Sequence, residues 1–115
     1  MSLQKGLNMN VSDVAKIPQL ELVSMEEDRP VTSVFTCDLL SVCMAKAPED
    51  GVWVTVMGNR NVIAVASLTD VACVIAAEGC SFDEEAVEAA KGRVTLLKSP
   101  LPVFETACLV HQGLV

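Results

Sequence analysis

The stretch Val52-Trp53-Val54-Thr55-Val56-Met57 begins the part of the chain that decides the fold. Two further apolar runs of strand length follow it, Val71-Ala72-Cys73-Val74-Ile75-Ala76 and Val94-Thr95-Leu96-Leu97. A turn-rich segment and then a segment with helical features follow each run. Because strand, turn and helix recur in this order, the sequence predicts strands that run parallel in one sheet. The first run does not alternate with polar residues, so both of its faces are expected to be buried.

The segment after the first strand allows two interpretations. Gly58-Asn59-Arg60-Asn61 is followed by the apolar residues 62–68. By propensity alone, β-branched residues on both sides of a Gly/Asn turn slightly favour a β-hairpin. The alternative is a short helix that is capped by Asn59 or Asn61 and ends at Leu68. The connection to the next strand is then long enough for a parallel crossover.

The N-terminal part is predicted to contribute one short helix and two short strands. Residues 1–10 have no clear period and are expected to form a frayed start, so that a single domain spans 11–115. Ser12 is expected to cap a short helix. Residues 20–23 alternate between apolar and polar, which is typical of a strand near an edge. A second short strand is expected over 31–35.

A helix over residues 37–46, capped by Thr36, is predicted next. Its apolar residues cover most of the helix circumference, whereas a surface helix would show one clean stripe. We therefore expect this helix to be either sandwiched in the fold or placed at a subunit contact.

Two more helices are predicted after the second and third strands of the opening stretch. Ser81 and Glu84 have the spacing of a capping box, and Gly92 is suited to the end of that helix. Ser99 is expected to cap the final helix, with Pro100 at the first helical position.

Composition and charge exclude several classes of protein. The chain has 115 residues, which fits one domain, and 51% of them are hydrophobic, enough for a core without metal or disulfide support. The formal net charge is -7 and the basic residues are scattered singly, so neither nucleic acid nor an acidic membrane surface is an expected partner. The apolar runs are too short to span a bilayer.

The cysteines and the single histidine argue against a metal centre and against catalysis. There are five cysteines, an odd number, and no C-x-x-C occurs, which is typical of a reducing, cytoplasmic setting. His111 has no neighbouring metal ligand in the sequence and is expected to be partly buried near the end of the last helix. No cofactor is implied. Because no nucleophile–base pair can be assigned, the sequence does not predict an enzyme.

Four stretches carry a resemblance to a known family: Val52-Trp53-Val54-Thr55-Val56-Met57-Gly58-Asn59-Arg60, Ala72-Cys73-Val74-Ile75-Ala76-Ala77-Glu78-Gly79, Asp83-Glu84-Glu85-Ala86-Val87 and Leu96-Leu97-Lys98-Ser99. In these stretches the chain resembles the DRTGG domain family, and Thr36-Cys37-Asp38-Leu39-Leu40-Ser41 extends the resemblance upstream. That domain occurs within some phosphotransacetylases, between the CBS domains of regulated pyrophosphatases, and alone in short proteins of anaerobes. The chain is also similar to the N-terminal domain of HPr serine kinase, without its kinase half.

The resemblance implies an α/β three-layer sandwich around a mainly parallel sheet, ending in βαβαβα like the N-terminal domain of HPr kinase. It therefore implies a helix, not a hairpin, after Gly58. The signature of the family is altered here, because Asn59-Arg60 stands in place of Asp-Arg and Ala77-Glu78-Gly79 in place of Thr-Gly-Gly. A function tied to the signature does not transfer directly.

In that fold three turns meet at the carboxyl edge of the sheet, where open α/β sheets bind ligands and helix N-termini attract anions. The expected ligand is a small anion or a nucleotide. The candidate binding residues are Gly58, Asn59, Arg60, Asn61, Glu78, Gly79, Lys98 and Ser99. No complete phosphate-binding loop is present, and the other interpretation is three ordinary turns with Arg60 in solvent.

The sequence predicts two alternative functions. The first is a non-enzymatic regulatory or assembly domain that forms a homodimer, because its helices are unusually apolar for a monomer surface. The resemblance adds an enzyme partner, because the short anaerobe proteins are often encoded near iron hydrogenases. The second is a sensor of a nucleotide or a phosphorylated metabolite at the turn edge.

Overall fold

The computed structural model describes residues 9–114, which form one five-stranded sheet. Across the sheet the strands are β1 (Glu21–Ser24), β5 (Thr95–Lys98), β4 (Cys73–Ala76), β3 (Gly51–Thr55) and β2 (Ser33–Thr36). β2, β3, β4 and β5 run parallel, and β1 pairs with β5 in the antiparallel direction. The mainly parallel sheet predicted from the sequence is confirmed.

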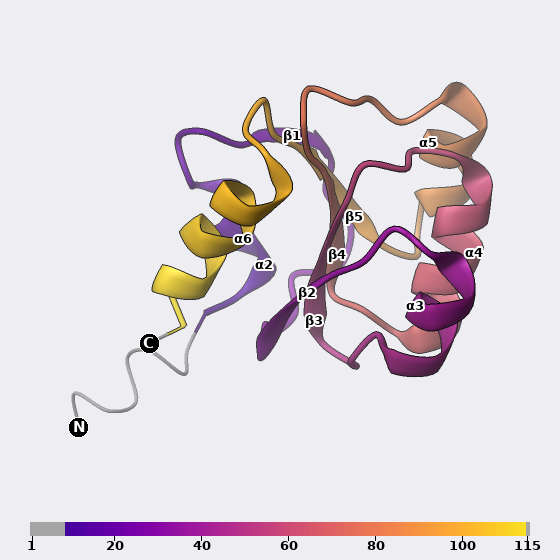
Figure 1. Cartoon of the computed structure of the whole chain (residues 1–115), viewed down its shortest axis with the longest axis horizontal. Coiled ribbons are helices and arrows are strands. Elements are labelled where there is room, and N and C mark those ends of the chain that lie inside the picture. The colour runs from indigo at the N-terminus through magenta and orange to yellow at the C-terminus, as the bar shows by residue number, and fades with distance from the viewer. Residues whose placement is uncertain (1–8, 115) are drawn as a thin grey trace.

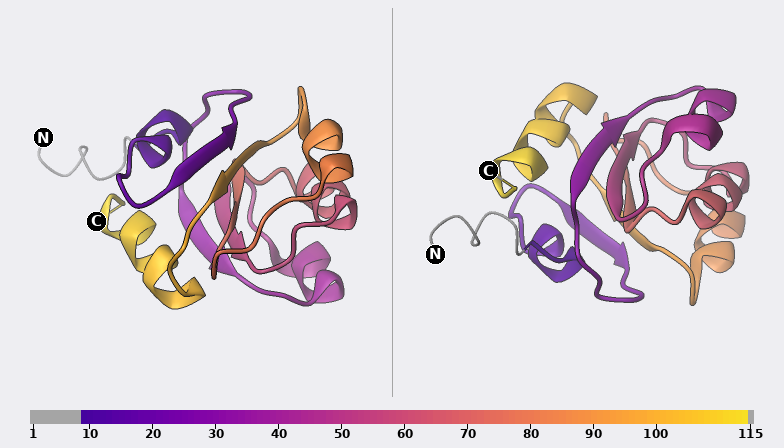
Figure 2. Two further views of the ribbon diagram at one scale, coloured as in Figure 1. Left: turned by 90° about the horizontal axis from the view of Figure 1, so that it is seen from above. Right: turned by 90° about the horizontal axis from the view of Figure 1, so that it is seen from below.

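Helices cover both faces of the sheet, so the fold has three layers (Figure 1). One face carries α3 (Leu40–Lys46), α4 (Arg60–Thr69) and α5 (Glu84–Ala90), and the other carries α2 (Val11–Ala15) and α6 (Val103–Gln112). The two views of Figure 2 show the same separation from above and below. Among the described residues, no helix combines the length and the hydropathy that crossing a bilayer requires.

The segment after β3 is a helix, so the hairpin favoured by propensity is wrong. Asn59 caps α4, because its side-chain oxygen accepts hydrogen bonds from the amides of Asn61 (2.9 Å) and Val62 (3.2 Å). Val62, Ile63, Val65 and Ala66 then pack against the sheet. Burial of this apolar helix face outweighs the β preference of the individual residues.

β3 is the centre of the core. All five of its residues are buried, as the unbroken apolar run predicts. Val52 and Val54 belong to the cluster under α2 and α6, whereas Trp53 belongs to the cluster under α3, α4 and α5. The Trp53 indole N–H donates a hydrogen bond to the Cys37 carbonyl oxygen (3.0 Å), which satisfies the polar atom of a fully buried ring.

Several helices begin at other residues than the sequence predicts. α5 is capped by Asp83, whose carboxylate accepts from the Ala86 amide (2.8 Å), and not by Ser81. The Asp83 amide donates a hydrogen bond to the Gly58 carbonyl (2.9 Å). Ser81 therefore lies in the turn that packs against Gly58, before the helix begins. The expected capping residue Ser99 likewise precedes α6 by several positions.

The N-terminal elements also shift slightly. α2 begins after Asn10, whose amide is held by the Asp13 carboxylate (2.9 Å), and not after Ser12. Within the expected frayed start, Met9 is buried and Asn10 precedes α2, while residues 1–8 lie outside the described residues. Thr36 is the last residue of β2 and does not cap α3.

Arg29 ties the loop before β2 to the amino edge of the sheet. Its Nε donates to Asp50 (3.0 Å) and its Nη1 to Asp70 (2.8 Å), while its side chain is only 13% exposed. Both aspartates have a left-handed backbone, Asp50 just before β3 and Asp70 at the end of α4. The hydrogen bond from Arg29 holds the pKa of Asp70 below its ordinary value. One cation therefore fixes two strained turns.

Replacing Arg29 by Met should lower the free energy of unfolding by about 2 kcal/mol, because a hydrogen bond to a charged group contributes about this much to stability. Since the pKa of Asp70 is lowered, its contribution is present at neutral pH and is lost as the pH falls through that lowered pKa. When the pH falls below about 4, the variant should therefore lose less stability than the wild type loses. Urea unfolding at several pH values measures both effects.

The matched control is Lys91→Met, which removes an exposed ion pair with Glu88. Its effect should stay within about 0.5 kcal/mol. Equal losses in the two variants would contradict a special role for Arg29.

Candidate functional site

The carboxyl edge of the sheet gathers segments from four strands. β3, β4 and β5 are parallel, so the turns that follow them lie at one edge, as the sequence predicts. β1 runs the other way, so its first residue, and not its last, lies at this edge. The turn before β1 therefore joins the turns after β4 and β5.

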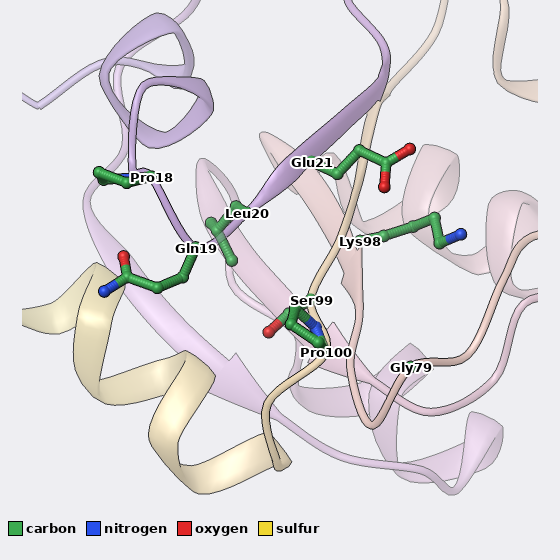
Figure 3. A pocket seen from close by; sticks show the side chains of 8 residues that line it. All are labelled: Pro18, Gln19, Leu20, Glu21, Gly79, Lys98, Ser99 and Pro100. Atoms are coloured by element: carbon green, nitrogen blue, oxygen red, sulfur yellow. The ribbon is translucent and has the colours of Figure 1, made fainter.

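A hollow of about 340 Å³ lies at this edge, and we call it the edge hollow. Figure 3 shows the side chains around it. Its lining residues come from the entry to β1, the turn after β4 and the end of β5: Pro18, Gln19, Leu20, Glu21, Gly79, Lys98, Ser99 and Pro100. Three of the residues predicted from the sequence, Gly79, Lys98 and Ser99, are brought together here.

Lys98 and Glu21 place opposite charges at the edge hollow. They are direct partners in the β1–β5 ladder, and their side chains extend from neighbouring strands in the same direction (Figure 3). Within the described residues no carboxylate lies within 4.0 Å of the Lys98 ammonium. Lys98 can therefore bind an anionic group, while Glu21 and the amide of Gln19 can bind donors next to it.

Ser99 has a structural role and is not free to bind a ligand through its hydroxyl group. Its side chain is buried, and its Oγ shares a 2.7 Å hydrogen bond with the Thr106 Oγ1 of α6. The same Oγ accepts from the Leu101 amide (3.1 Å). These bonds fix the turn between β5 and α6, so that Lys98 is held in place by a rigid neighbour.

The turn after β4 has two consecutive residues with an unusual backbone. Glu78 and Gly79 both have a left-handed backbone, with φ of 61° and 73°. Glycine adopts this conformation without the cost that a Cβ brings, and Glu78 stands where the DRTGG signature has a glycine. In return, the Glu78 carboxylate accepts from the Val103 amide (3.3 Å) at the start of α6. Negative charge is favourable at that helix end.

The other four predicted residues, Gly58 to Asn61, do not line the edge hollow. Arg60 lies instead beside Glu85 of α5, at 3.7 Å, and both side chains are exposed. A Cβ at Gly58 would overlap the Ser81 carbonyl oxygen, so glycine is needed there for close packing of two turns. The structure thus places Gly79, Lys98 and Ser99 at the edge hollow, and Arg60 away from it between α4 and α5.

Sequence reasoning missed the contribution of residues 18–21. They precede a strand, and carboxyl-edge reasoning on parallel strands considers only the residues that come after a strand. The antiparallel direction of β1 was the missing information. Asp38 falls within the helix predicted over residues 37–46, but it lies before α3, which begins at Leu40. Its carboxylate accepts from the Thr55 Oγ1 (2.7 Å) and from the Val56 amide (2.9 Å), which ties the segment before α3 to the end of β3.

A second, apolar hollow lies between α6 and the edge strand β2, and we call it the α6 hollow. Its volume is about 270 Å³, and it is lined by Val34, Thr36, Phe104, Ala107, Cys108 and His111. Phe104 is 75% exposed. His111 is also exposed, and the expectation that it is partly buried is wrong. Thr106 and Val110 form the buried face of α6 instead, so Phe104 and His111 lie on its outer side.

The described residues offer polar and charged binding groups at the edge hollow. Within residues 9–114 no group of three or more His, Cys, Asp or Glu side chains is arranged to hold a metal ion. The one hydroxyl at the edge hollow, on Ser99, is bonded to Thr106 and not to a base. The arrangement can hold a ligand or a partner surface.

Comparison with solved structures finds one with a similar fold. The chain is similar to the regulatory region of Clostridium perfringens pyrophosphatase, which comprises CBS and DRTGG domains and was solved with its activator, diadenosine tetraphosphate. The TM-score is 0.71 at 16% identity, and the match covers 96% of this chain. The chain has a DRTGG-like fold. It spans about half of the regulatory chain that it matches, 49% of the length. No family model and no curated protein matches the sequence.

The left-handed backbone of Glu78 gives a test of this turn. Glu78→Gly and Glu78→Ala both lose the carboxylate at α6, so the difference between them isolates the backbone cost. We expect the glycine variant to be more stable by about 1 kcal/mol, because only alanine has a Cβ in the left-handed region. Chemical denaturation of both variants measures the difference.

Glu88 in α5 is the matched control, since it is exposed and helical. There alanine should be more stable than glycine by about 1 kcal/mol, the opposite sign. The same sign at both positions would contradict the assigned backbone of Glu78.

Proposed function

We propose that this chain is a non-enzymatic regulatory or assembly domain that acts as a homodimer. The observation that carries the proposal is the α6 hollow, where an exposed aromatic side chain, Phe104, stands beside an apolar depression. Contiguous apolar surface rimmed by polar groups is typical of a protein interaction site. The similarity to a pyrophosphatase regulatory region supports a regulatory role without catalysis.

Charge favours a second copy of this chain as the partner at the α6 hollow. The chain has a net charge of -7, so two copies repel each other over most of their surface. The hollow is lined by Val34, Thr36, Phe104, Ala107, Cys108 and His111, none of which is an acid or a Lys or Arg. A twofold axis here would place the Phe104 ring of each copy in the hollow of the other, which is the self-complementary contact of a C2 dimer.

α3, for which the sequence left a subunit contact open, and α6 differ in what surrounds their exposed apolar residues. On α3 and its cap, Met44 and Leu39 are 45% and 60% exposed. Neither of them lines the edge hollow or the α6 hollow, whereas Phe104 on α6 lines the α6 hollow. The α6 surface also continues onto β2, an edge strand whose outer side has no partner strand within the described residues.

Phe104→Asp should weaken the dimer on the order of 100-fold, as expected for loss of a central aromatic anchor and burial of a charge. The wild type should have the mass of a dimer at micromolar concentration, and the variant that of a monomer. Light scattering coupled to gel filtration measures this.

Leu68→Asp is the matched control, because Leu68 is 72% exposed on α4, on the opposite face of the sheet. This variant should remain dimeric. A monomeric wild type, or equal dissociation of both variants, would refute the proposed interface.

A second candidate function is a sensor of a small anionic ligand, either a nucleotide or a phosphorylated metabolite. It is supported by Lys98, which lines the edge hollow without an ion pair among the described residues. The similar pyrophosphatase region binds a nucleotide activator, which adds support for a ligand of this class. In this proposal Gly79 and Ser99 shape the hollow, and Glu21 and Gln19 bind donor groups of the ligand. Glu78 holds the neighbouring turn, and Asn59, Arg60 and Asn61 take no part.

A thermal-shift screen with nucleotides and acyl phosphates tests the sensor. A ligand at about 100 times its Kd should stabilise the fold by about 2.7 kcal/mol and raise Tm by several degrees. Lys98→Ala should abolish the rise, whereas Arg60→Ala should leave it intact, since Arg60 lies outside the edge hollow. A ligand that still binds the Lys98 variant, or a screen without any stabilising compound, would reject this function.

We further propose a cytoplasmic setting and an enzyme partner. The five cysteines are all free, which supports a reducing compartment. The resemblance to short DRTGG proteins supports an accessory role to a metabolic or redox enzyme such as iron hydrogenase. Retention of that enzyme from a native extract on the immobilised wild-type domain, with loss on a Phe104→Asp column, would support a shared surface.

A further inference from the structure

Two of the five free cysteines, Cys37 and Cys43, lie close together at the start of α3. The Cys43 Sγ approaches the Cys37 carbonyl oxygen at 3.7 Å, and the Cys37 side chain packs against the cluster that contains Cys43. The chain reverses between them, because the Cys43 amide donates to the Leu39 carbonyl (3.0 Å) and begins the helix there. Cys43 is fully buried, whereas Cys37 is half-buried and can be reached from solvent.

The segment that carries Cys37 is anchored at the Cys37 carbonyl and at the next residue. The Cys37 carbonyl accepts the indole N–H of Trp53 at 3.0 Å, and the next residue, Asp38, is held by Thr55 and Val56. The two sulfurs therefore cannot drift apart freely. Because Trp53 is the only tryptophan of the chain, its fluorescence reports on this one site.

We propose that Cys37 and Cys43 form a thiol-modification site, which reacts with a low-molecular-weight disulfide such as glutathione disulfide to form an internal disulfide. This site is separate from the edge hollow and from the α6 hollow, since neither cysteine lines them. It does not depend on the proposed dimer or on the proposed ligand.

The reaction has two exchange steps. The Cys37 thiolate attacks one sulfur of glutathione disulfide and expels one glutathione thiolate, which leaves a mixed disulfide on Cys37. The Cys43 thiolate then attacks the Cys37 sulfur and expels the second glutathione thiolate. The two protein thiols are oxidised to one disulfide, glutathione disulfide is reduced to two glutathione molecules, and the two thiol protons pass to the glutathione thiolates.

The environment of Cys43 sets the order of these steps. Burial raises the pKa of the Cys43 thiol to about 12, and the neighbouring Cys37 side chain contributes to that rise. Cys43 is therefore a poor first nucleophile. Once Cys37 carries the mixed disulfide it can no longer become a thiolate beside Cys43, so that part of the barrier to Cys43 ionisation is removed. The first attack thus belongs to the reachable thiol and the second to the buried one.

The other cysteines do not offer the same arrangement. Cys73 is fully buried in the sheet, and burial raises the pKa of its thiol to about 12. Cys80 lies in the turn after β4 and Cys108 on α6, and both are partly exposed. Their reactions with an oxidant would obscure the readout, so the test is made in the full chain carrying Cys80→Ser and Cys108→Ser.

In this background three thiols remain, Cys37, Cys43 and Cys73. Incubation in glutathione buffers of increasing oxidised fraction should reduce the count of free thiols from three to one. Peptide mapping should find Cys37 linked to Cys43, and the fluorescence of Trp53 should change in parallel as its Cys37 acceptor is displaced. Dithiothreitol should restore both signals.

Two variants of this background separate the steps. Cys43→Ser should stop at a glutathione adduct on Cys37. Cys37→Ser should keep both remaining thiols over the same time, because Cys43 and Cys73 are buried. Far-ultraviolet circular dichroism before oxidation checks that each variant is folded. A glutathione adduct that persists on Cys37 while Cys43 is present, or a cross-link that includes Cys73, would overturn the proposal.

Discussion

Burial of β3 on both faces is the constraint on which the rest of the molecule depends. A strand in the middle of a parallel sheet has no solvated side, so Gly51 to Thr55 must be covered by helices above and below. Each connection between neighbouring parallel strands then needs a crossover helix, and α3, α4 and α5 supply these on one face. α6 and α2 close the other face, and Arg29 fixes the amino edge where β3 and β4 begin.

The same constraint creates the edge that carries the candidate site. Parallel strands end together, so the turns after β4 and β5 are held next to each other by bonds such as that from the Gly79 amide to the Ser99 carbonyl (3.0 Å). The single antiparallel strand, β1, pairs Glu21 directly with Lys98. The edge hollow thus exists because one strand departs from the parallel pattern.

Two kinds of polar residue at the turns must be distinguished. Asn59, Asp83 and Ser99 form hydrogen bonds with backbone or side-chain groups of the fold itself. Lys98 is different, since its ammonium group has no carboxylate partner within the described residues. The apolar surface at Phe104 is different again, because it offers area and no charge. A ligand site and an interface can therefore coexist on separate parts of this small fold.

The sequence by itself determined the parallel sheet, the full burial of β3 and the position of the turns, because unbroken apolar runs have one stable placement in an α/β fold. It also pointed to Gly79, Lys98 and Ser99 at one edge. It did not determine that residues 60–69 are helical, since β propensity is local and the burial that overrules it comes from the sheet. Only the tertiary structure showed that residues 18–21 line the edge hollow, that Arg60 lies apart from Lys98 and that Cys37 lies near Cys43. Each of these depends on strand direction or on chain reversal, which bring together residues that no spacing rule along the chain connects.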